Sequence, residues 1–469
     1  MTDNNCSRTL FYCLLLVLVW LPLPFGSKPL WAMSVFQIMI WLLTLGWLVG
    51  YAAGYQEITR SFRRGVPVMV LIFIVGLWQL CQSLQLPAEI VQTVSPISYR
   101  HHEAAATALG LAVPSKMTLS LDPFATHTHA LLTFAYGLLF ALILLVVDEL
   151  RRVKLLAWAM VIAGAGQAMF GLISTLSGLE LSFFIPKEHG KGVATGTFVN
   201  RNNLAGHLEM TLAIGVGLLL YRLNDKPSHG WREFFYETLK TLMSSKVLLR
   251  VVLAAMVIAL VMTHSRMGNT AFFSSLLVTV LLYAFSRKKL SRGMIVLFVS
   301  LILVDTAIVS QWFGVEKLVE RIEQTSLATE TRDDVNPVTL EILNDFMATG
   351  SGAGSYYTTL PSYHDGSWRG FYDLAHNDYL QFPLEFGLPA FLLLAVAVLF
   401  TCQQSILAMR KRRNLLSIGM GFAATMGILS ILIHSAVDFN LQIPANAAYF
   451  VVLMAIAFLA RSVNGRDIN

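Results

Sequence analysis

Residues 30–53 read LWAMSVFQIMIWLLTLGWLVGYAA, a run of 24 residues without a charged side chain. A helix of that length rises about 36 Å, which exceeds the roughly 30 Å thickness of a bilayer's hydrocarbon core. Within a bilayer, a helix satisfies its own backbone hydrogen bonds. This stretch therefore predicts a transmembrane helix.

Similar apolar runs recur along the 469 residues, of which 55% are hydrophobic and only 13% are charged. This composition is typical of a membrane protein. We expect an all-α membrane protein with about twelve transmembrane helices, forming a single polytopic domain over residues 1–469. Re-entrant segments would change the count to eleven or thirteen. The expected spans are residues 10–25, 30–53, 68–84, 130–147, 155–177, 204–221, 248–262, 270–285, 294–309, 387–402, 415–436 and 445–459.

The basic residues predict the orientation of these spans. With a cytoplasmic N-terminus, 23 of the 34 lysines and arginines fall in short cytoplasmic loops and tails. This bias follows the positive-inside rule and predicts a bacterial inner-membrane protein with both termini in the cytoplasm. The net charge of +6 is then a sign of topology, and no nucleic-acid partner is expected. The first run could also be a signal peptide, although no convincing small-residue cleavage site follows it.

Two long outer loops are expected, at residues 85–129 and 310–386, and a shorter one at 178–203. The loop at 310–386 lies between the ninth and tenth spans and contains helical patterns at 315–322 and 338–346. It is predicted to be partly folded and to carry part of an active site at the periplasmic face. The inner stretch 223–246 is either an amphipathic segment on the inner leaflet or a plain connector.

Two arginines lie at the outer ends of predicted spans. GTFVNRNNLAG (196–206) places Arg201 among asparagines, and THSRMG (263–268) places Arg266 in a tight hairpin. A lone arginine at such a boundary is usually a snorkelling anchor. Two arginines, each in a polar cluster on the face with few basic residues, favour a functional site.

A third polar region combines GSGAGSYY (350–357), WRGFYDLAHNDYLQ (368–381) and EFGL (385–388). A helix is expected over 375–385, with Asp373 as its N-cap and His376 in its first turn. An imidazole near a helix N-terminus tends to stay neutral and so remains a competent base. Nearby aromatic residues either anchor the loop at the membrane interface or form a sugar-stacking surface. These aromatic residues are Tyr356, Tyr357, Trp368, Phe371 and Tyr372.

Two arginines and a neutral histidine suit the displacement of a diphosphate leaving group. Guanidinium groups bind phosphate oxygens in bidentate fashion as charge builds on them. Histidine can accept the proton of an attacking hydroxyl near neutral pH. The outer loops show no spaced carboxylate cluster for a divalent ion, since Asp333 and Asp334 are adjacent, so neither a metal nor a cofactor is expected.

These motifs together resemble the superfamily of O-antigen ligases and O-antigen (surface polysaccharide) polymerases. The resemblance rests on NRNN around Arg201, HSRMG around Arg266, GSGAGS, AHNDYLQ with the following EFGL, and HSAVDFNLQIPAN at 434–446. Members commonly carry an arginine followed by a tryptophan-containing helix before the glycine-rich turn. Here Arg332 is followed by DDVNP instead, so no role is carried over to Arg332.

The resemblance implies a metal-independent, inverting glycosyltransferase acting in lipopolysaccharide or exopolysaccharide biosynthesis. The donor would be a glycan on undecaprenyl diphosphate, and the acceptor would be another glycan or lipid A–core. Membrane lipids would surround the protein. By match, His376 would be the base and Arg201 and Arg266 would bind the donor diphosphate. Further residues expected to support the site or face the acceptor are Asn200, Asn202, Tyr356, Tyr357, Trp368, Asn377, Asp378, Tyr379, Gln381, Glu385 and Asp438.

The sequence leaves several functions open. A polymerase, a ligase and an oligosaccharyltransferase acting on protein serine differ only in the acceptor, and the C-terminal motif favours a polymerase. A transporter or flippase of lipid-linked sugars predicts charged residues in mid-span and paired broken helices. Asp305 is one of few acidic residues within a predicted span, and most polar residues gather on one face. The enzyme interpretation is therefore favoured.

Overall fold

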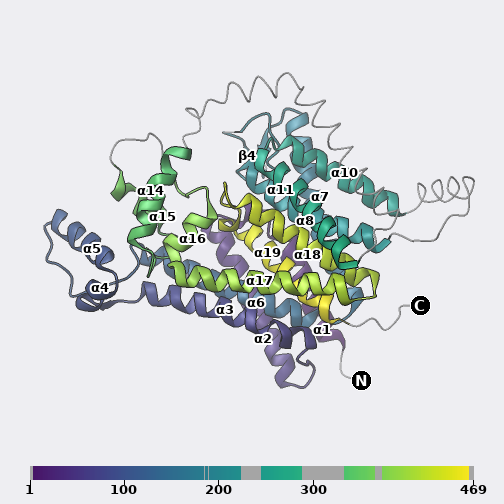
Figure 1. Cartoon of the computed structure of the whole chain (residues 1–469), viewed down its shortest axis with the longest axis horizontal. Helices are drawn as coiled ribbons and strands as arrows, with labels where there is room; N and C mark the ends of the chain where they lie inside the picture. Colours follow the sequence, from purple (N-terminus) through teal and green to yellow (C-terminus); the bar gives the residue numbers. More distant parts are fainter. Residues whose placement is uncertain are drawn as a thin grey trace, which may run out of the picture.

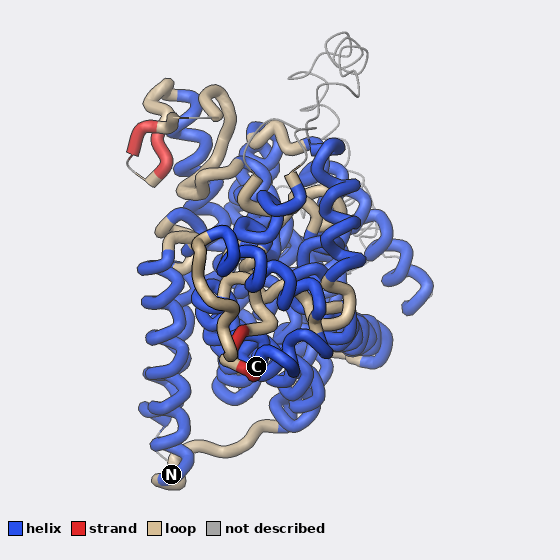
Figure 2. Tube along the Cα trace, turned by 90° about the vertical axis from the view of Figure 1, so that its left-hand side faces the viewer, coloured by secondary structure: helices blue, strands red, loops and turns tan. Residues whose placement is uncertain are grey.

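The structure is a computed structural model that describes residues 4–183, 185–188, 190–222, 245–287, 332–364 and 372–463. Nearly all regular structure in these ranges is helical (Figures 1 and 2). The strands described are two short antiparallel pairs, β1 (Leu86–Pro87) with β2 (Lys116–Met117) and β3 (Leu181–Ser182) with β4 (Ile185–Pro186). The chain is an all-α protein, as predicted.

Nine helices in the described ranges are long and apolar enough to cross a membrane. They are α2 (Leu30–Ala52), α3 (Arg60–Ser83), α6 (Pro123–Val146), α7 (Leu150–Leu176), α8 (Arg201–Arg222), α11 (Arg266–Arg287), α17 (Leu388–Lys411), α18 (Leu415–His434) and α19 (Pro444–Ser462). Two further apolar helices, α1 (Asn4–Trp20) and α10 (Ser245–Met262), match predicted spans but have shorter apolar stretches. The predicted span at 294–309 lies outside the described residues.

Helices α8, α18 and α19 form the centre of the bundle (Figure 1). Residues of α8 and α19 are almost completely buried, whereas much of α17 is exposed. The backbones of α8 and α18 approach closely at Gly217 and Gly419, since a Cβ on Gly217 would lie 2.4 Å from the Gly419 carbonyl oxygen. Small residues permit this close packing between membrane helices.

Shorter elements cluster around one end of the bundle. They include α4 (Ala88–Val94), α5 (Pro96–Ala108), α14 (Arg332–Asp345), α15 (Tyr356–Thr359), α16 (Asp378–Phe386) and the 3₁₀ turns η1 (Phe25–Ser27), η3 (Leu360–Tyr363) and η4 (Asn440–Gln442). The helix expected at 338–346 is confirmed as part of α14. The patterns at 315–322 and 223–246 lie outside the described residues.

Candidate active site

The first arginine of the site opens helix α8. The Asn200 side-chain oxygen accepts a hydrogen bond from the Asn202 backbone N–H at 2.8 Å, which is how an N-cap residue stabilises the first turn of a helix. Arg201 follows this cap and is exposed. The NRNN motif therefore caps α8 and presents a guanidinium group beside the positive end of the helix.

The second arginine has the same local arrangement. The Ser265 hydroxyl accepts a hydrogen bond from the Gly268 N–H at 3.1 Å, and exposed Arg266 is the first residue of α11. The first turns of α8 and α11 pack together, because a Cβ on Gly268 would lie 2.7 Å from the Ala205 Cβ. Two helix N-termini, each with an arginine, thus lie next to each other, and such ends favour anions.

His376 does not lie within a helix, contrary to the expectation. Helix α16 begins at Asp378, and its N-cap is Asn377, whose side chain accepts hydrogen bonds from the N–H groups of Tyr379 and Leu380. The expected helix over 375–385 with Asp373 as its cap is wrong at its start. His376 has a φ of +52°, a backbone conformation that is uncommon for a residue other than glycine.

Asp373 is engaged elsewhere, which explains the different cap. Its carboxylate binds Lys28 Nζ at 2.9 Å, and Lys28 also lies 5.9 Å from the centre of the Phe439 ring. The Phe439 ring in turn packs edge-on against His376 at 4.6 Å. Lys28 is therefore a cation close to the aromatic ring that packs against the histidine. The sequence offered no motif that would have identified it.

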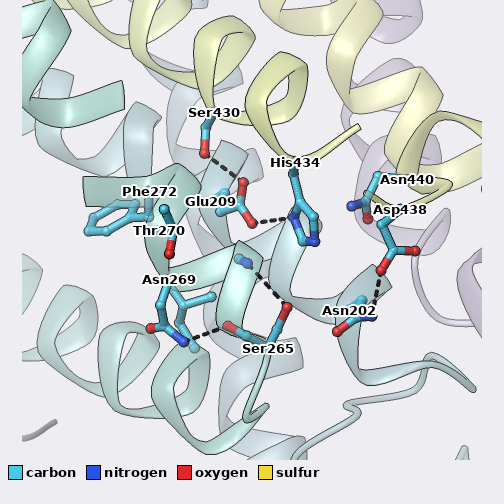
Figure 3. A network of polar contacts seen from close by, with 12 residues as sticks. Asn202, Glu209, Ser265, Asn269, Thr270, Phe272, Ser430, His434, Asp438 and Asn440 are labelled. Atoms are coloured by element: carbon cyan, nitrogen blue, oxygen red, sulfur yellow. Dashed lines mark hydrogen bonds and ion pairs between the residues drawn. The ribbon is translucent and has the colours of Figure 1, made fainter. Parts of the chain in front are cut away.

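The segment 434–446 joins the parts of the site. The Asn202 amide donates to the Asp438 carboxylate at 2.5 Å (Figure 3), and the Asn446 amide donates to the Asn203 carbonyl at 2.9 Å. Phe439 follows Asp438 and contacts His376. The C-terminal motif thus links the NRNN motif of α8 to the loop that carries the histidine.

A fully buried pair of a carboxyl and an imidazole lies beneath these contacts. Glu209 of α8 meets His434 Nδ1 at 2.7 Å and accepts a hydrogen bond from the Ser430 hydroxyl at 2.6 Å (Figure 3). A Cβ on Gly268 would lie 3.2 Å from the same carboxylate. Removing either partner is costly, because it leaves a buried polar group without its hydrogen bond. Glu209 and His434 therefore tie α8 and α18 together beside the first turn of α11.

Asp378 forms the base of the histidine loop. Its carboxylate accepts hydrogen bonds from the Ser435 hydroxyl at 2.7 Å and the Leu441 N–H at 3.1 Å. Only 2% of the residue is exposed. Burial raises the pKa of this carboxyl to about 8, although the two hydrogen bonds oppose the shift. Asp378 is thus largely protonated at neutral pH.

Glu385 holds the glycine-rich turn in place. Its carboxylate accepts hydrogen bonds from the N–H groups of Gly354 and Tyr356 and from the Gln381 amide. The Gln381 oxygen accepts from the Ala375 N–H at 2.9 Å, next to His376. Burial raises the pKa of Glu385 to about 7, against the opposing effect of these hydrogen bonds. Glu385 and Gln381 connect the turn at 350–357 with the histidine loop.

The aromatic residues of the loop do not form one surface. Tyr356 is fully buried and its hydroxyl lies 2.9 Å from that of Thr339, so it cannot stack on a sugar. Burial raises the pKa of Tyr356 to about 12. Tyr357 is 53% exposed, and Tyr379, at 39%, donates its hydroxyl to the Leu432 carbonyl. Trp368 and Phe371 lie outside the described residues.

The arrangement suits an anionic ligand beside a proton acceptor. Two helix N-termini and two arginines offer positive charge, and a partly buried histidine lies on the adjoining loop. In the part of the chain that the structure describes, no three His, Cys, Asp or Glu side chains come together in a way that could hold a metal ion. The fold defines a multi-pass helical membrane protein, and two neighbouring helix N-termini, each with an exposed arginine, lie at one end of its bundle.

Comparison with known proteins is consistent with this class. Residues 251–395 match a family model described as O-Antigen ligase. This match supports the assignment of the chain to the superfamily of O-antigen ligases and O-antigen polymerases. The matched range includes Arg266 and His376, whereas Arg201 and Asp438 lie outside it. A search of curated proteins found no match.

Proposed function

We propose that the protein transfers a glycan from undecaprenyl diphosphate to a sugar hydroxyl at the periplasmic face of the bacterial inner membrane. The main support is that segment 434–446 contacts both the NRNN motif and the His376 loop. Residues far apart in the sequence thereby meet at one end of the helix bundle. The family match adds that the function is of the O-antigen ligase or polymerase type.

The donor diphosphate would bind between the first turns of α8 and α11. Arg201 and Arg266 would contact its oxygens, and the N–H groups of both helix ends would add further positive charge. These interactions strengthen as the leaving group gains charge, so they stabilise the transition state more than the bound donor. Lys28, close to Phe439, is a further candidate for this charge.

His376 would act as the general base. The acceptor hydroxyl gives its proton to the imidazole while its oxygen forms a bond to the anomeric carbon of the donor. The bond from that carbon to the phosphate oxygen breaks, and its electron pair leaves with the diphosphate. Attack from the opposite side inverts the anomeric centre. No metal ion takes part in this proposal.

A purified-protein assay tests this function. The protein is incubated with a lipid-linked glycan donor, with and without lipid A–core, and products are separated by size. Ladders without core identify a polymerase, and transfer that requires core identifies a ligase. Transfer to a serine-containing protein instead would identify a protein oligosaccharyltransferase, and movement of the intact lipid across vesicles would identify a flippase.

A matched pair of variants tests the base. His376→Ala should lose transfer by at least about a hundredfold, the usual contribution of a general base, while its expression stays normal. His364→Ala removes an exposed histidine of the same loop and should keep full activity. Normal polysaccharide from His376→Ala would rule out His376 as the base.

A further inference from the structure

A polar cavity of about 570 Å³ lies at the end of the bundle away from the candidate active site. Its walls come from the start of α1, the segment between α2 and α3, the segment between α6 and α7, and the end of α19. Helix α19 begins beside the NRNN motif and ends at the cavity, so the two sites lie at opposite ends of this helix. The predicted orientation places the cavity at the cytoplasmic face.

Four arginines lie close together at one side of this cavity. Arg60 belongs to its wall. Arg64, one turn further along α3, donates a hydrogen bond to the Arg461 carbonyl at 3.3 Å. Burial lowers the pKa of Arg412, and the nearby charges of Arg461 and Arg60 lower it further. Arg60, Arg64 and Arg461 form no ion pair with a carboxylate among the described residues, so this side of the cavity attracts an anion.

The same cavity also has carboxylates in its wall. Glu57 comes from the segment before α3, and Asp148 and Glu149 come from the segment before α7. Asp148 pairs with Arg152 at 3.3 Å, and Arg152 also donates to the Ser7 hydroxyl at 2.7 Å. Glu57 and Glu149 are exposed and form no ion pair in the part of the chain that the structure describes. These two carboxylates can therefore bind a cation.

A buried amide in the wall lacks a hydrogen-bond partner. Gln56 lines the cavity and is 7% exposed, and its Nε2 has no partner among the described residues. A buried N–H group without an acceptor is unfavourable, and a phosphate oxygen would satisfy it. Because Gln56 directly precedes Glu57, an anion at the amide and a cation at the carboxylate would be close enough to belong to one small ligand.

The surface beside the cavity is apolar. Tyr55 and Ile58 belong to the wall and are 52% and 36% exposed. Helix α2 ends just before them, and one of its faces carries Leu45, Leu48 and Val49, which are 57%, 50% and 60% exposed. In a bilayer, such a face contacts acyl chains. A ligand with its polar head in the cavity and apolar chains along α2 would be a phospholipid.

We propose that this cavity binds the head group of a zwitterionic aminophospholipid such as phosphatidylethanolamine. The phosphate lies beside Arg60 and the Gln56 amide, and the ammonium lies beside Glu57 and Glu149. The volume is within the roughly 300–1,000 Å³ that holds one small ligand. The wall contains two arginines and three carboxylates, which favours a ligand with both charges over an anionic lipid. The inference goes beyond the proposed function, because no residue of the candidate active site takes part.

Binding of defined lipids to the purified full-length chain tests this site. Delipidated protein in detergent is titrated with phosphatidylethanolamine, phosphatidylcholine or phosphatidylglycerol carrying the same acyl chains, and native mass spectrometry measures the bound lipid. Phosphatidylcholine has no N–H group, and phosphatidylglycerol has no cation. Phosphatidylethanolamine should therefore bind at least about tenfold more tightly than either, the usual effect of one hydrogen bond to a charged group. Inorganic phosphate and glycerophosphoethanolamine, which lack acyl chains, should not displace it.

Matched variants assign the binding to this cavity. Arg60→Gln should weaken the binding of phosphatidylethanolamine at least about tenfold. Arg63→Gln is the control, because it removes an exposed arginine of the same helix turn that does not line the cavity, and it should bind as the wild type does. The double variant Glu57→Gln with Glu149→Gln should bind phosphatidylglycerol more tightly than phosphatidylethanolamine, since only the carboxylates that favour the ammonium are lost.

Four results would overturn the inference. They are a wild-type preference for phosphatidylglycerol, equal binding of phosphatidylethanolamine and phosphatidylcholine, displacement by inorganic phosphate, and identical lipid binding by Arg60→Gln and Arg63→Gln. The first would indicate an anionic lipid at the arginines, and the third would indicate a site for free phosphate. The comparison of lipids uses the wild type alone, so it is decisive even if a variant does not fold. None of these measurements depends on glycan transfer, so the proposed function stands or fails separately.

Discussion

Replacing Asp378 with asparagine should make the protein less sensitive to alkaline pH. The carboxyl is 2% exposed, and burial raises its pKa from 3.8 to about 8. The folded state therefore keeps a proton that the unfolded state releases at a much lower pH. Stability from this group is fully present below pH 3.8 and is lost as the pH rises toward 8. Asparagine has nearly the same shape as the neutral carboxyl group but cannot ionise, so its contribution to stability does not change with pH.

The size of the effect follows from the shift. One pKa unit corresponds to about 1.36 kcal/mol, so wild-type stability should fall by about 1.4 kcal/mol per pH unit relative to Asp378→Asn across this range. Between pH 6 and 8 the difference reaches roughly 2–3 kcal/mol. The raised pKa of Glu385, about 7, is the same in the wild type and in Asp378→Asn. It therefore does not contribute to the difference in stability between the two proteins.

Thermal unfolding of purified protein in detergent at pH 6, 7, 8 and 9 measures this difference. The wild-type midpoint should fall relative to that of Asp378→Asn by a few degrees over the series. Asp378→Ala is the control. It leaves the Ser435 hydroxyl and the Leu441 N–H without their acceptor, so it should unfold at a lower temperature at every pH. Parallel curves for the wild type and Asp378→Asn would refute a neutral, buried carboxyl.

Three further outcomes test the site. Arg266→Lys should lose most transfer activity in the purified-protein assay, because a point charge replaces a planar fork; wild-type turnover would mean that Arg266 only anchors α11. Asn202→Asp should abolish activity, because it places two carboxylates where the structure has a 2.5 Å hydrogen bond. Adding Asp438→Asn should restore activity. Full activity of Asn202→Asp alone would mean that the pair has no role. Gly352→Ala should lower the unfolding midpoint by an amount equivalent to at least about 1–3 kcal/mol, since φ is +106° and the new methyl group would lie 2.1 Å from a side-chain oxygen. Gly110→Ala, with a φ of +68° and open space around it, should cost less in the same thermal assay.

Helix positions were predictable because a long apolar run has few alternatives to a helix in a bilayer. Eleven of the twelve predicted spans coincide with described helices, counting the nine long ones together with α1 and α10. Helix boundaries were less predictable. Helix α3 begins at Arg60, eight residues before the predicted span, because Thr59 caps it and accepts a hydrogen bond from the Phe62 N–H. Hydrophobicity marks the buried part of a helix but does not mark its cap.

The positions of the two arginines were predictable, because they depend on local motifs. Arg201 and Arg266 each follow a capping residue, a pattern that can be recognised within a few residues. Lys28 could not be found in this way, because its partner Asp373 is 345 residues away. The same ion pair explains why Asp373 does not cap α16: the choice between it and Asn377 depends on a contact with a distant segment.

The position of the buried Glu209–His434 pair argues against a transport function. Charges that move substrates or ions are expected near the middle of membrane spans, where they line a path. Glu209 is about two turns into α8, and His434 is the last residue of α18, so the pair lies near the same end of the bundle as His376. Its hydrogen bonds join α8 to α18 directly below the segment that contacts Asn202 and His376. Such a pair holds α8 and α18 together, as the proposed reaction at one face of the membrane would require.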